Sequence, residues 1–227
     1  ELIHIRESKK EFPFLMKMFA YIMVLFYTLT HFTSIEFIYT MDYRVVAFMI
    51  FAFLIPMVFI HDFKKYNIND ALFLIGSVLF IGLSFNLIII CRNYDISYVL
   101  YLLLITTLTD TFALFTGSLV GRHKLCPKVS PKKTVEGLIG GVFLGTFAAV
   151  AFYVTFINPA IPLITIVSIT LILALVGQLG DLVFSSIKRY YDKKDFSNLI
   201  PGHGGILDRF DSLIFVVLAF IIFSSIL

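Results

Sequence analysis

The feature that most constrains this chain is a series of apolar stretches, each long enough to form a helix through a lipid bilayer. A hydrocarbon core of about 30 Å needs roughly 20 apolar residues per helix. Backbone polar groups in lipid must be paired within their own segment, so helices are the expected form. The stretches cover residues 14–31, 44–61, 71–91, 96–117, 137–158, 162–188 and 209–227.

Composition agrees with this interpretation. Hydrophobic residues make up 59% of the 227 positions and charged residues only 15%, whereas an ordinary soluble domain carries roughly 25% charged residues. The sequence therefore predicts an all-α, polytopic integral membrane bundle of about seven transmembrane helices.

The positions of Lys and Arg predict how such a bundle is oriented. Of the 18 basic residues, all except Arg44 and Arg92 fall in the N-terminal segment or in the second, fourth and sixth connections. A seven-helix chain places these four regions on one side, and basic loops mark the cytosolic side. We therefore expect a cytosolic N-terminus and a C-terminus on the opposite side.

The chain is expected to form one integral-membrane domain over residues 1–227. Helices within 1–95 carry little specific signal, and the catalytic part is expected within 96–227, with cytosolic loops at 118–136 and 189–208. Because the chain begins at Glu1 rather than Met, we expect a further segment to precede it. The two cysteines, Cys91 and Cys126, have no metal-binding or redox spacing, and the expected topology puts them on opposite sides of the membrane. Gly137, Gly141 and Gly145 indicate close helix packing.

Ionisable residues inside membrane helices are costly and are functional candidates by default. Asp110 and Asp181 lie near the cytosolic ends of their stretches, and Gln178 stands beside Asp181. Ser185 and Lys188 follow Asp181 at spacings of four and three, so these three residues share one helix face. This stripe leads from within the membrane to the basic segment at its surface.

The segment beyond Lys188 concentrates residues suited to phosphate chemistry. Asp208 and Asp211 lie one turn apart at the start of the last helix, where negative charge is favoured. Carboxylate oxygens are the ligands that Mg²⁺ prefers, and the glycines of 202–205 allow backbone N–H groups to approach an anion. The basic residues that would balance phosphate charge are Lys188, Arg189, Lys194 and Arg209. The pattern indicates phosphoryl or nucleotidyl transfer at the membrane surface; binding to lipid headgroups would explain the lysines but not the aspartates among them.

The fourth connection holds a second polar cluster. Thr134 is placed to cap the fifth helix, with Glu136 in its first turn and Lys132 and Lys133 just before it. Ser130 opens the turn that leads into this run. A helix N-terminus preceded by two lysines suits a triphosphate, although the glycines here do not form a Walker A loop.

The run from Ser185 to Asp211, SSIKRYYDKKDFSNLIPGHGGILDRFD, resembles the signature of the phosphatidate cytidylyltransferases, also called CDP-diacylglycerol synthases. The upstream region resembles the family more loosely, and Phe112, Leu114 and Ser118 depart from the expected pattern. The fixed positions that match are Ser185, Lys188, Arg189, Lys194, Asp195, Ser197, Ile200, Pro201, His203, Gly204, Gly205, Ile206, Asp208, Arg209, Phe210 and Asp211.

The resemblance implies a Mg²⁺-dependent nucleotidyltransferase of phospholipid biosynthesis. Such an enzyme converts CTP and phosphatidic acid into CDP-diacylglycerol and pyrophosphate. It also implies a dinuclear cation site on Asp181 and Asp208, with Asp211 in support and Mg²⁺ or K⁺ as the second cation. The expected catalytic residues are Asp181, Lys188, Arg189, Asp208, Arg209 and Asp211; the expected substrate-binding residues are Asp110, Ser130, Lys132, Lys133, Thr134, Glu136, Ser185, Lys194, His203, Gly204 and Gly205.

The same resemblance implies a homodimer among membrane lipids, with no nucleic acid as a partner. Short loops and small size suggest a bacterial plasma (inner) membrane, with the active site facing the cytosol. Two other functions stay open. One is a CTP-dependent polyprenol or phytol kinase, which would release CDP. The other is an ion or proton transporter using Asp110 and Asp181 as a relay, although nothing ionisable continues that path to the other side.

Overall fold

The computed structural model describes residues 1–29, 43–60, 62–202 and 204–224. Within these ranges the protein is helical, apart from connections and one short hairpin. Its elements in chain order are α1 (Leu2–Glu7), α2 (Phe14–Leu29), α3 (Tyr43–Leu54), α4 (Pro56–Phe59), α5 (Ile68–Tyr94), α6 (Ile96–Val120), β1 (Lys124–Cys126), β2 (Ser130–Thr134), α7 (Val135–Phe156), α8 (Leu163–Tyr190) and α9 (Leu207–Phe223).

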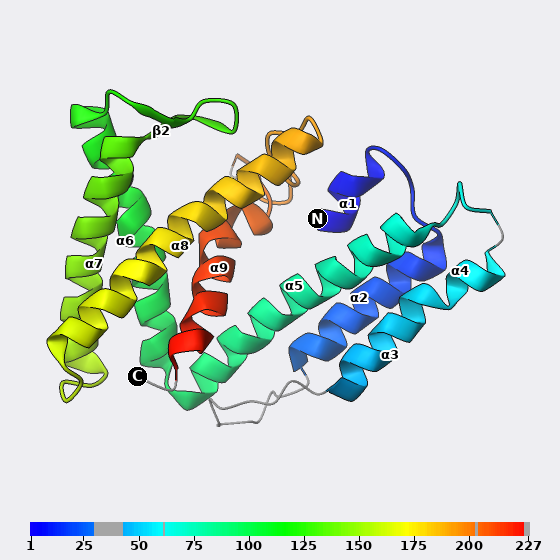
Figure 1. Cartoon of the computed structure of the whole chain (residues 1–227), viewed down its shortest axis with the longest axis horizontal. Helices are drawn as coiled ribbons and strands as arrows, with labels where there is room; N and C mark the ends of the chain where they lie inside the picture. Colours follow the sequence, from blue (N-terminus) through cyan, green and yellow to red (C-terminus); the bar gives the residue numbers. More distant parts are fainter. Residues whose placement is uncertain (30–42, 61, 203, 225–227) are drawn as a thin grey trace.

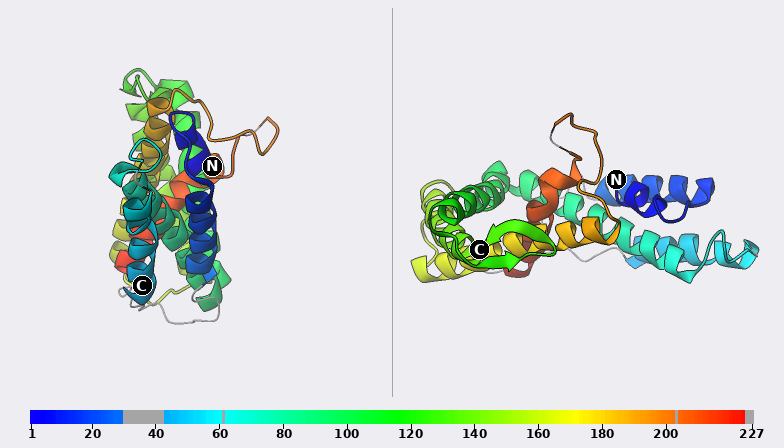
Figure 2. Two further views of the ribbon diagram at one scale, coloured as in Figure 1. Left: turned by 90° about the vertical axis from the view of Figure 1, so that its right-hand side faces the viewer. Right: turned by 90° about the horizontal axis from the view of Figure 1, so that it is seen from above.

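The helices form an elongated array. Figure 1 shows α6 and α7 paired at one end, α2 and α3 at the other, and α5, α8 and α9 between them. The β1–β2 hairpin, the loop between α8 and α9, and α1 all gather at the same ends of the long helices, and the side view in Figure 2 agrees. This end carries the segments in which the sequence predicts the chemistry.

Each of the seven predicted apolar stretches is helical over most of its described residues. Among the described residues, α5, α6, α7 and α8 are long and apolar enough to cross a membrane. The chain is thus a helical membrane protein. Seven spans and the cytosolic N-terminus stay predictions.

The stretch predicted as one helix over 44–61 is divided in the structure. Pro56 has no backbone N–H to donate and its ring clashes with the preceding turn, so α3 ends at Leu54 and the single turn of α4 starts at Pro56. A second difference lies in the loop 118–136, where β1 and β2 form an antiparallel hairpin.

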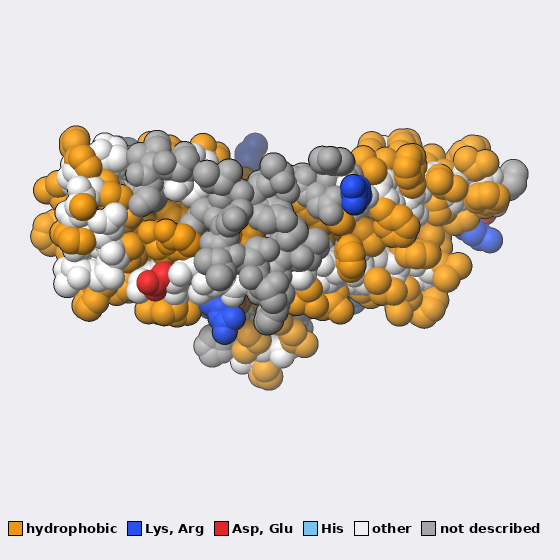
Figure 3. Space-filling view, turned by 90° about the horizontal axis from the view of Figure 1, so that it is seen from below, with side chains coloured by type: hydrophobic (Ala, Val, Ile, Leu, Met, Phe, Trp, Pro, Cys, Tyr) orange, Lys and Arg blue, Asp and Glu red, His pale blue; other side chains and the backbone are white. Residues whose placement is uncertain are grey.

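Apolar side chains fill the interior and also cover the outside. Tyr101, Tyr153 and Ile166 are fully buried in an apolar cluster to which α5, α6, α7, α8 and α9 all contribute. In contrast, Leu114 and Phe147 are 76% and 79% exposed. Exposed apolar side chains such as these suit lipid contact. Figure 3 views the molecule from below, at the helix ends opposite the hairpin, and its described part shows a few charged side chains among apolar ones.

The interface of α6 and α7 depends on residues without bulky side chains. A Cβ at Gly141 would stand 2.6 Å from the carbonyl oxygen of Thr109 and from the Cβ of Ala113. At Gly145 it would stand 2.9 Å from the Cα of Thr109. The predicted close packing of these glycines is confirmed, and it fixes the two helices that border the site.

Candidate active site

Asp181 of α8 lies in a chain of polar contacts that crosses from the hairpin to α6. Lys133 at the end of β2 places its Nζ 2.5 Å from Asp181 Oδ2 and donates to Gln178 Oε1 at 3.1 Å. Gln178 Nε2 in turn donates to Asp110 Oδ1 at 2.6 Å. The two intramembrane aspartates singled out from the sequence are therefore joined through one lysine and one amide.

A cavity of about 450 Å³ opens beside these contacts. Lys132, Lys133 and Thr134 line it from the hairpin and the start of α7, and Asp110 and Asp181 line it from α6 and α8. The polar run of the fourth connection thus borders the same space as the two aspartates of α6 and α8. It offers ammonium groups and carboxylates to one ligand.

The N-terminus of α7 is built as the sequence predicts. Thr134 Oγ1 accepts a hydrogen bond from Gly137 N at 3.1 Å, which satisfies one of the free N–H groups of the first turn. Glu136, predicted to bind substrate, has its carboxylate engaged by the hairpin. Its carboxylate accepts from the backbone N–H groups of Arg122 and His123 and pairs with His123 Nδ1 at 2.5 Å, so it closes the base of the hairpin.

Asp208 forms a second centre at the start of α9. Its Oδ1 accepts from Lys188 Nζ at 2.7 Å, and its Oδ2 accepts from Phe196 N and Gly205 N, each at 2.9 Å. Asp208 lies in the predicted loop 189–208. Burial raises the pKa of its carboxyl, but the bonds from Lys188 and the two N–H groups outweigh burial and hold the pKa below its ordinary value.

The turn before Asp208 needs glycine at one position for two reasons. Gly204 has φ +82°, in the left-handed region that favours glycine. A Cβ there would also stand 3.0 Å from Asp208 Oδ2. Its carbonyl accepts from Ile200 N at 2.9 Å, which closes the turn. His203, predicted to bind substrate, lies outside the described residues.

The other predicted residues surround these two centres. Ser185 Oγ donates to Asp181 Oδ1 at 3.3 Å. Arg189 donates to the carbonyls of Val129 in the hairpin and Lys193 in the loop, at 3.3 and 3.0 Å, so it links the hairpin to the α8–α9 loop. Three predicted residues lie elsewhere on this end: Ser130 pairs with Cys126 in the hairpin, and Lys194 and Arg209 are exposed.

The predicted cation ligands do not form one group. Among the described residues, no three His, Cys, Asp or Glu side chains are arranged to hold a metal ion. Asp211 lies within electrostatic range of Asp181 and Asp110, whereas Asp208 is bonded to Lys188. In kind, the carboxylate oxygens fit Mg²⁺, but the cationic partners of Asp181 and Asp208 in this structure are lysines.

Gln178 is the residue whose part the sequence reasoning missed. The sequence shows it beside Asp181 but does not show its role, whereas in the structure it is 2% exposed and hydrogen-bonded on both sides. The available signal was its place one turn before Asp181 on the same helix face. A buried amide in an apolar helix needs partners, and ionisable side chains are the obvious ones.

Comparisons with known proteins all point to cytidylyltransferases. The whole chain, residues 1–227, matches the family described as "Cytidylyltransferase family". A phosphatidate cytidylyltransferase of Staphylococcus aureus (strain COL) is 44% identical over 154 residues, covering 68% of this chain and 59% of that protein. One of Bacillus subtilis (strain 168) is 43% identical over 157 residues, covering 68% and 58%. The match thus spans less than two thirds of the length of these relatives.

Proposed function

The chain belongs to the cytidylyltransferase family, and from this membership we propose that it is a CTP:phosphatidate cytidylyltransferase. The reaction would join CTP and phosphatidic acid to give CDP-diacylglycerol and pyrophosphate. The names of its bacterial relatives support this reaction. The observation that carries it is the cavity in which Lys132, Lys133 and Thr134 meet Asp110 and Asp181.

The chemistry is a displacement at phosphorus. A phosphate oxygen of phosphatidate attacks the α-phosphorus of CTP, a new P–O bond forms, and the bond to the β-phosphate breaks to release pyrophosphate. The attacking phosphate is already ionised near neutral pH, so a general base contributes little. Catalysis then consists of positioning and of neutralising charge.

Residues in different places would contact the two substrates. Lys132 and Lys133, at the N-terminus of α7, would bind the triphosphate, because a helix N-terminus and ammonium groups both attract phosphate. Arg189 and Arg209 lie where α8 ends and α9 begins, near the expected plane of the lipid phosphate.

We propose that Mg²⁺ is held by Asp181 and Asp208, with Asp211 in support and Mg²⁺ or K⁺ as a second cation. When bound, it would offset the repulsion between the two phosphates. The carboxylate oxygens of these aspartates are hard donors of the kind that Mg²⁺ prefers, which supports this assignment.

The proposed setting follows from charge and apolar length. We propose seven spans, a cytosolic N-terminus, a site facing the cytosol of a bacterial plasma membrane, and a homodimer. The gathering of the hairpin, the α8–α9 loop and α1 at one end supports a single catalytic face. Phosphatidate would reach it sideways from the bilayer and CTP from the cytosol.

The test uses the protein in mild detergent with phosphatidate, Mg²⁺ and CTP labelled in the α-phosphate. We expect label in the lipid phase and release of pyrophosphate, both lost on chelation. Asp181→Asn should abolish transfer in protein that is still folded, because it removes the charge at the centre of the site.

The outcome also separates the rival functions. Label that reaches a polyprenol from γ-labelled CTP, with CDP released, would identify a lipid kinase instead. No labelled lipid from intact protein under either condition would overturn the proposed activity.

A further inference from the structure

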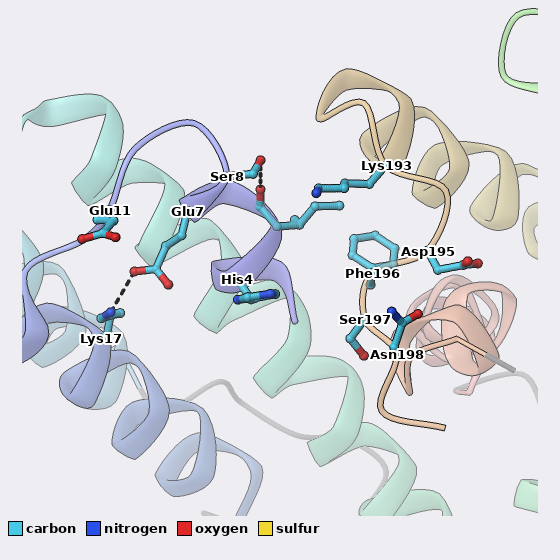
Figure 4. Close-up of a pocket in the computed structure, with 11 residues that line it drawn as sticks. His4, Glu7, Ser8, Glu11, Lys17, Lys193, Asp195, Phe196, Ser197 and Asn198 are labelled. Carbon is cyan, nitrogen blue, oxygen red and sulfur yellow. Dashed lines mark hydrogen bonds and ion pairs between the residues drawn. The ribbon is translucent and has the colours of Figure 1, made fainter. Parts of the chain in front are cut away.

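The first ten residues, called here the N-terminal segment, lie across the loop that joins α8 and α9. Leu2 and Ile5 of α1 are buried in one cluster with Phe184 of α8 and Phe196 of the loop. Figure 4 shows His4 of α1 facing Phe196 and its neighbours across a cavity of about 690 Å³. The segment therefore packs against the catalytic loop rather than only leading into α2.

Polar contacts fix the same segment at two further helix ends. Lys9 Nζ donates to the carbonyl of Tyr190 at 2.8 Å, at the end of α8, and lies 3.7 Å from the Tyr190 ring centroid. Arg6 and Lys10 both pair with Asp70 in the first turn of α5, Arg6 at 3.0 Å. Residues 6–10 of the segment are thus held by α5 and α8.

The contact with α9 is made by Glu1. Its Oε1 accepts from Ser197 Oγ at 2.7 Å and from Ile206 N at 2.8 Å, and its Oε2 accepts from Leu207 N at 2.7 Å. These two N–H groups open α9, and N–H groups at a helix start have no acceptor earlier in the helix. A carboxylate at a helix N-terminus is stabilising, so Glu1 caps α9 from a position 206 residues before Leu207.

Two carboxylates share the N–H groups of this turn. Gly205 N donates to Asp208, and the next two N–H groups donate to Glu1. Glu1 therefore holds the stretch of backbone that presents Asp208 to Lys188.

Gly205 gives independent support for this arrangement. Among the described glycines, only Gly202 and Gly204 have positive φ, so the backbone at 205 would accept an alanine. A Cβ there would stand 2.6 Å from Glu1 Oε1 and 2.7 Å from Ser197 Oγ. What excludes a side chain at 205 is the Glu1–Ser197 contact.

We propose that Glu1 is a positioning residue: its carboxylate caps α9 and fixes the 205–208 turn, so that Asp208 stays bonded to Lys188. The effect of Glu1 on turnover rests on the proposed function, whereas its effect on the order of the 205–208 turn is independent of that function.

The experiment compares Glu1→Ala, Gly205→Ala and the double variant in the same chain. Glu11→Gln is the control, because it removes an exposed negative charge just after the segment. Amide hydrogen exchange over 196–208, kcat, KM for CTP and the thermal midpoint are measured. Without the carboxylate, the two N–H groups lose charge-assisted hydrogen bonds and the turn opens more often. Exchange at Ile206 and Leu207 should therefore become at least about tenfold faster in Glu1→Ala, and kcat should fall about tenfold with a smaller change in KM.

The double variant is the decisive comparison. If Glu1 is what excludes a side chain at 205, adding Gly205→Ala to Glu1→Ala should cost little more, because the carboxylate is then absent and the Ser197 hydroxyl, which keeps only its bond from Leu199 N at 3.3 Å, can move aside. Losses that multiply, or unchanged exchange in Glu1→Ala, would overturn the proposal. If Glu1→Ala does not fold, Glu1→Gln, which keeps one acceptor oxygen, is judged by the same exchange measurement. A wild-type protein without turnover would refute the proposed function, while the exchange data would still judge Glu1.

Discussion

Two aspartates of the site each form an ion pair with a lysine. Asp181 pairs with Lys133 of the hairpin, and Asp208 pairs with Lys188 near the end of α8. The pair of Lys188 and Asp208 is the more buried, with side chains 10% and 4% exposed. Removing one partner of such a pair leaves the other charge without compensation in a region of low polarity. At the scale of single residues, this pair should matter more for stability than the exposed lysines around it.

Lys188→Met tests this difference. Breaking a buried pair costs about 3–5 kcal/mol, and because Asp208 keeps two backbone N–H partners we expect the lower end, about 3 kcal/mol, in the free energy of unfolding. The thermal midpoint in detergent measures it, with exposed Lys194→Met as the control. Equal midpoints for the two variants would contradict a structural role for the Lys188–Asp208 pair.

At the scale of elements, the frame of the site is the interlocked pair α6 and α7. Asp110 lies on α6 and the Thr134 cap begins α7, so their separation sets the width of the cavity. Thr109 lies against Gly141 and Gly145, and neither position has space for a methyl group.

Gly145→Ala should force the helices apart. Overpacking of this kind costs about 1–3 kcal/mol, so the thermal midpoint should fall. Gly76→Ala in α5 is the matched control, because a Cβ at Gly76 would meet nothing within 4 Å. Replacing glycine by alanine within a helix then stabilises by about 0.5–1 kcal/mol. If both variants shift the midpoint alike, the interface is not close-packed.

Elements were predictable where periodicity or length carried the signal. The apolar stretches predict the long helices to within a few residues, and Thr134 marks the start of α7 as expected. The hairpin was not predictable, because strands of three and five residues with lysines among them have no alternating apolar pattern. Hydropathy does not reveal the break at Pro56, because apolar residues continue on both sides of it.

Contacts between remote segments were the part that no local pattern could supply. The sequence indicates that Asp181, Lys133 and Asp208 are functional, but the partner of each depends on how helices cross. The capping of α9 by Glu1 joins residues that lie 206 positions apart in the sequence. Such a contact follows only from the assembled fold.

At the scale of the whole molecule, the two cysteines allow the predicted orientation in the membrane to be measured. Cys126 in the hairpin is partly exposed, whereas Cys91 is buried with 1% exposure. A membrane-impermeant maleimide should therefore label Cys126 in inverted vesicles and leave it unlabelled in intact cells, because the hairpin is predicted to face the cytosol. Cys126→Ser controls for labelling elsewhere. Labelling from outside intact cells would reverse the predicted orientation.

The length of α8 has a consequence for where chemistry meets lipid. Its 28 residues span about 42 Å, whereas the hydrocarbon layer is about 30 Å thick. The surplus must be taken up by tilt or by emergence of one end. Asp181 lies nine residues before the C-terminal end of α8, about 14 Å along its axis. The depth of Asp181 below the headgroups therefore follows the thickness of the surrounding bilayer, and lipids with longer or shorter chains would bring the lipid phosphate to a different height along α8.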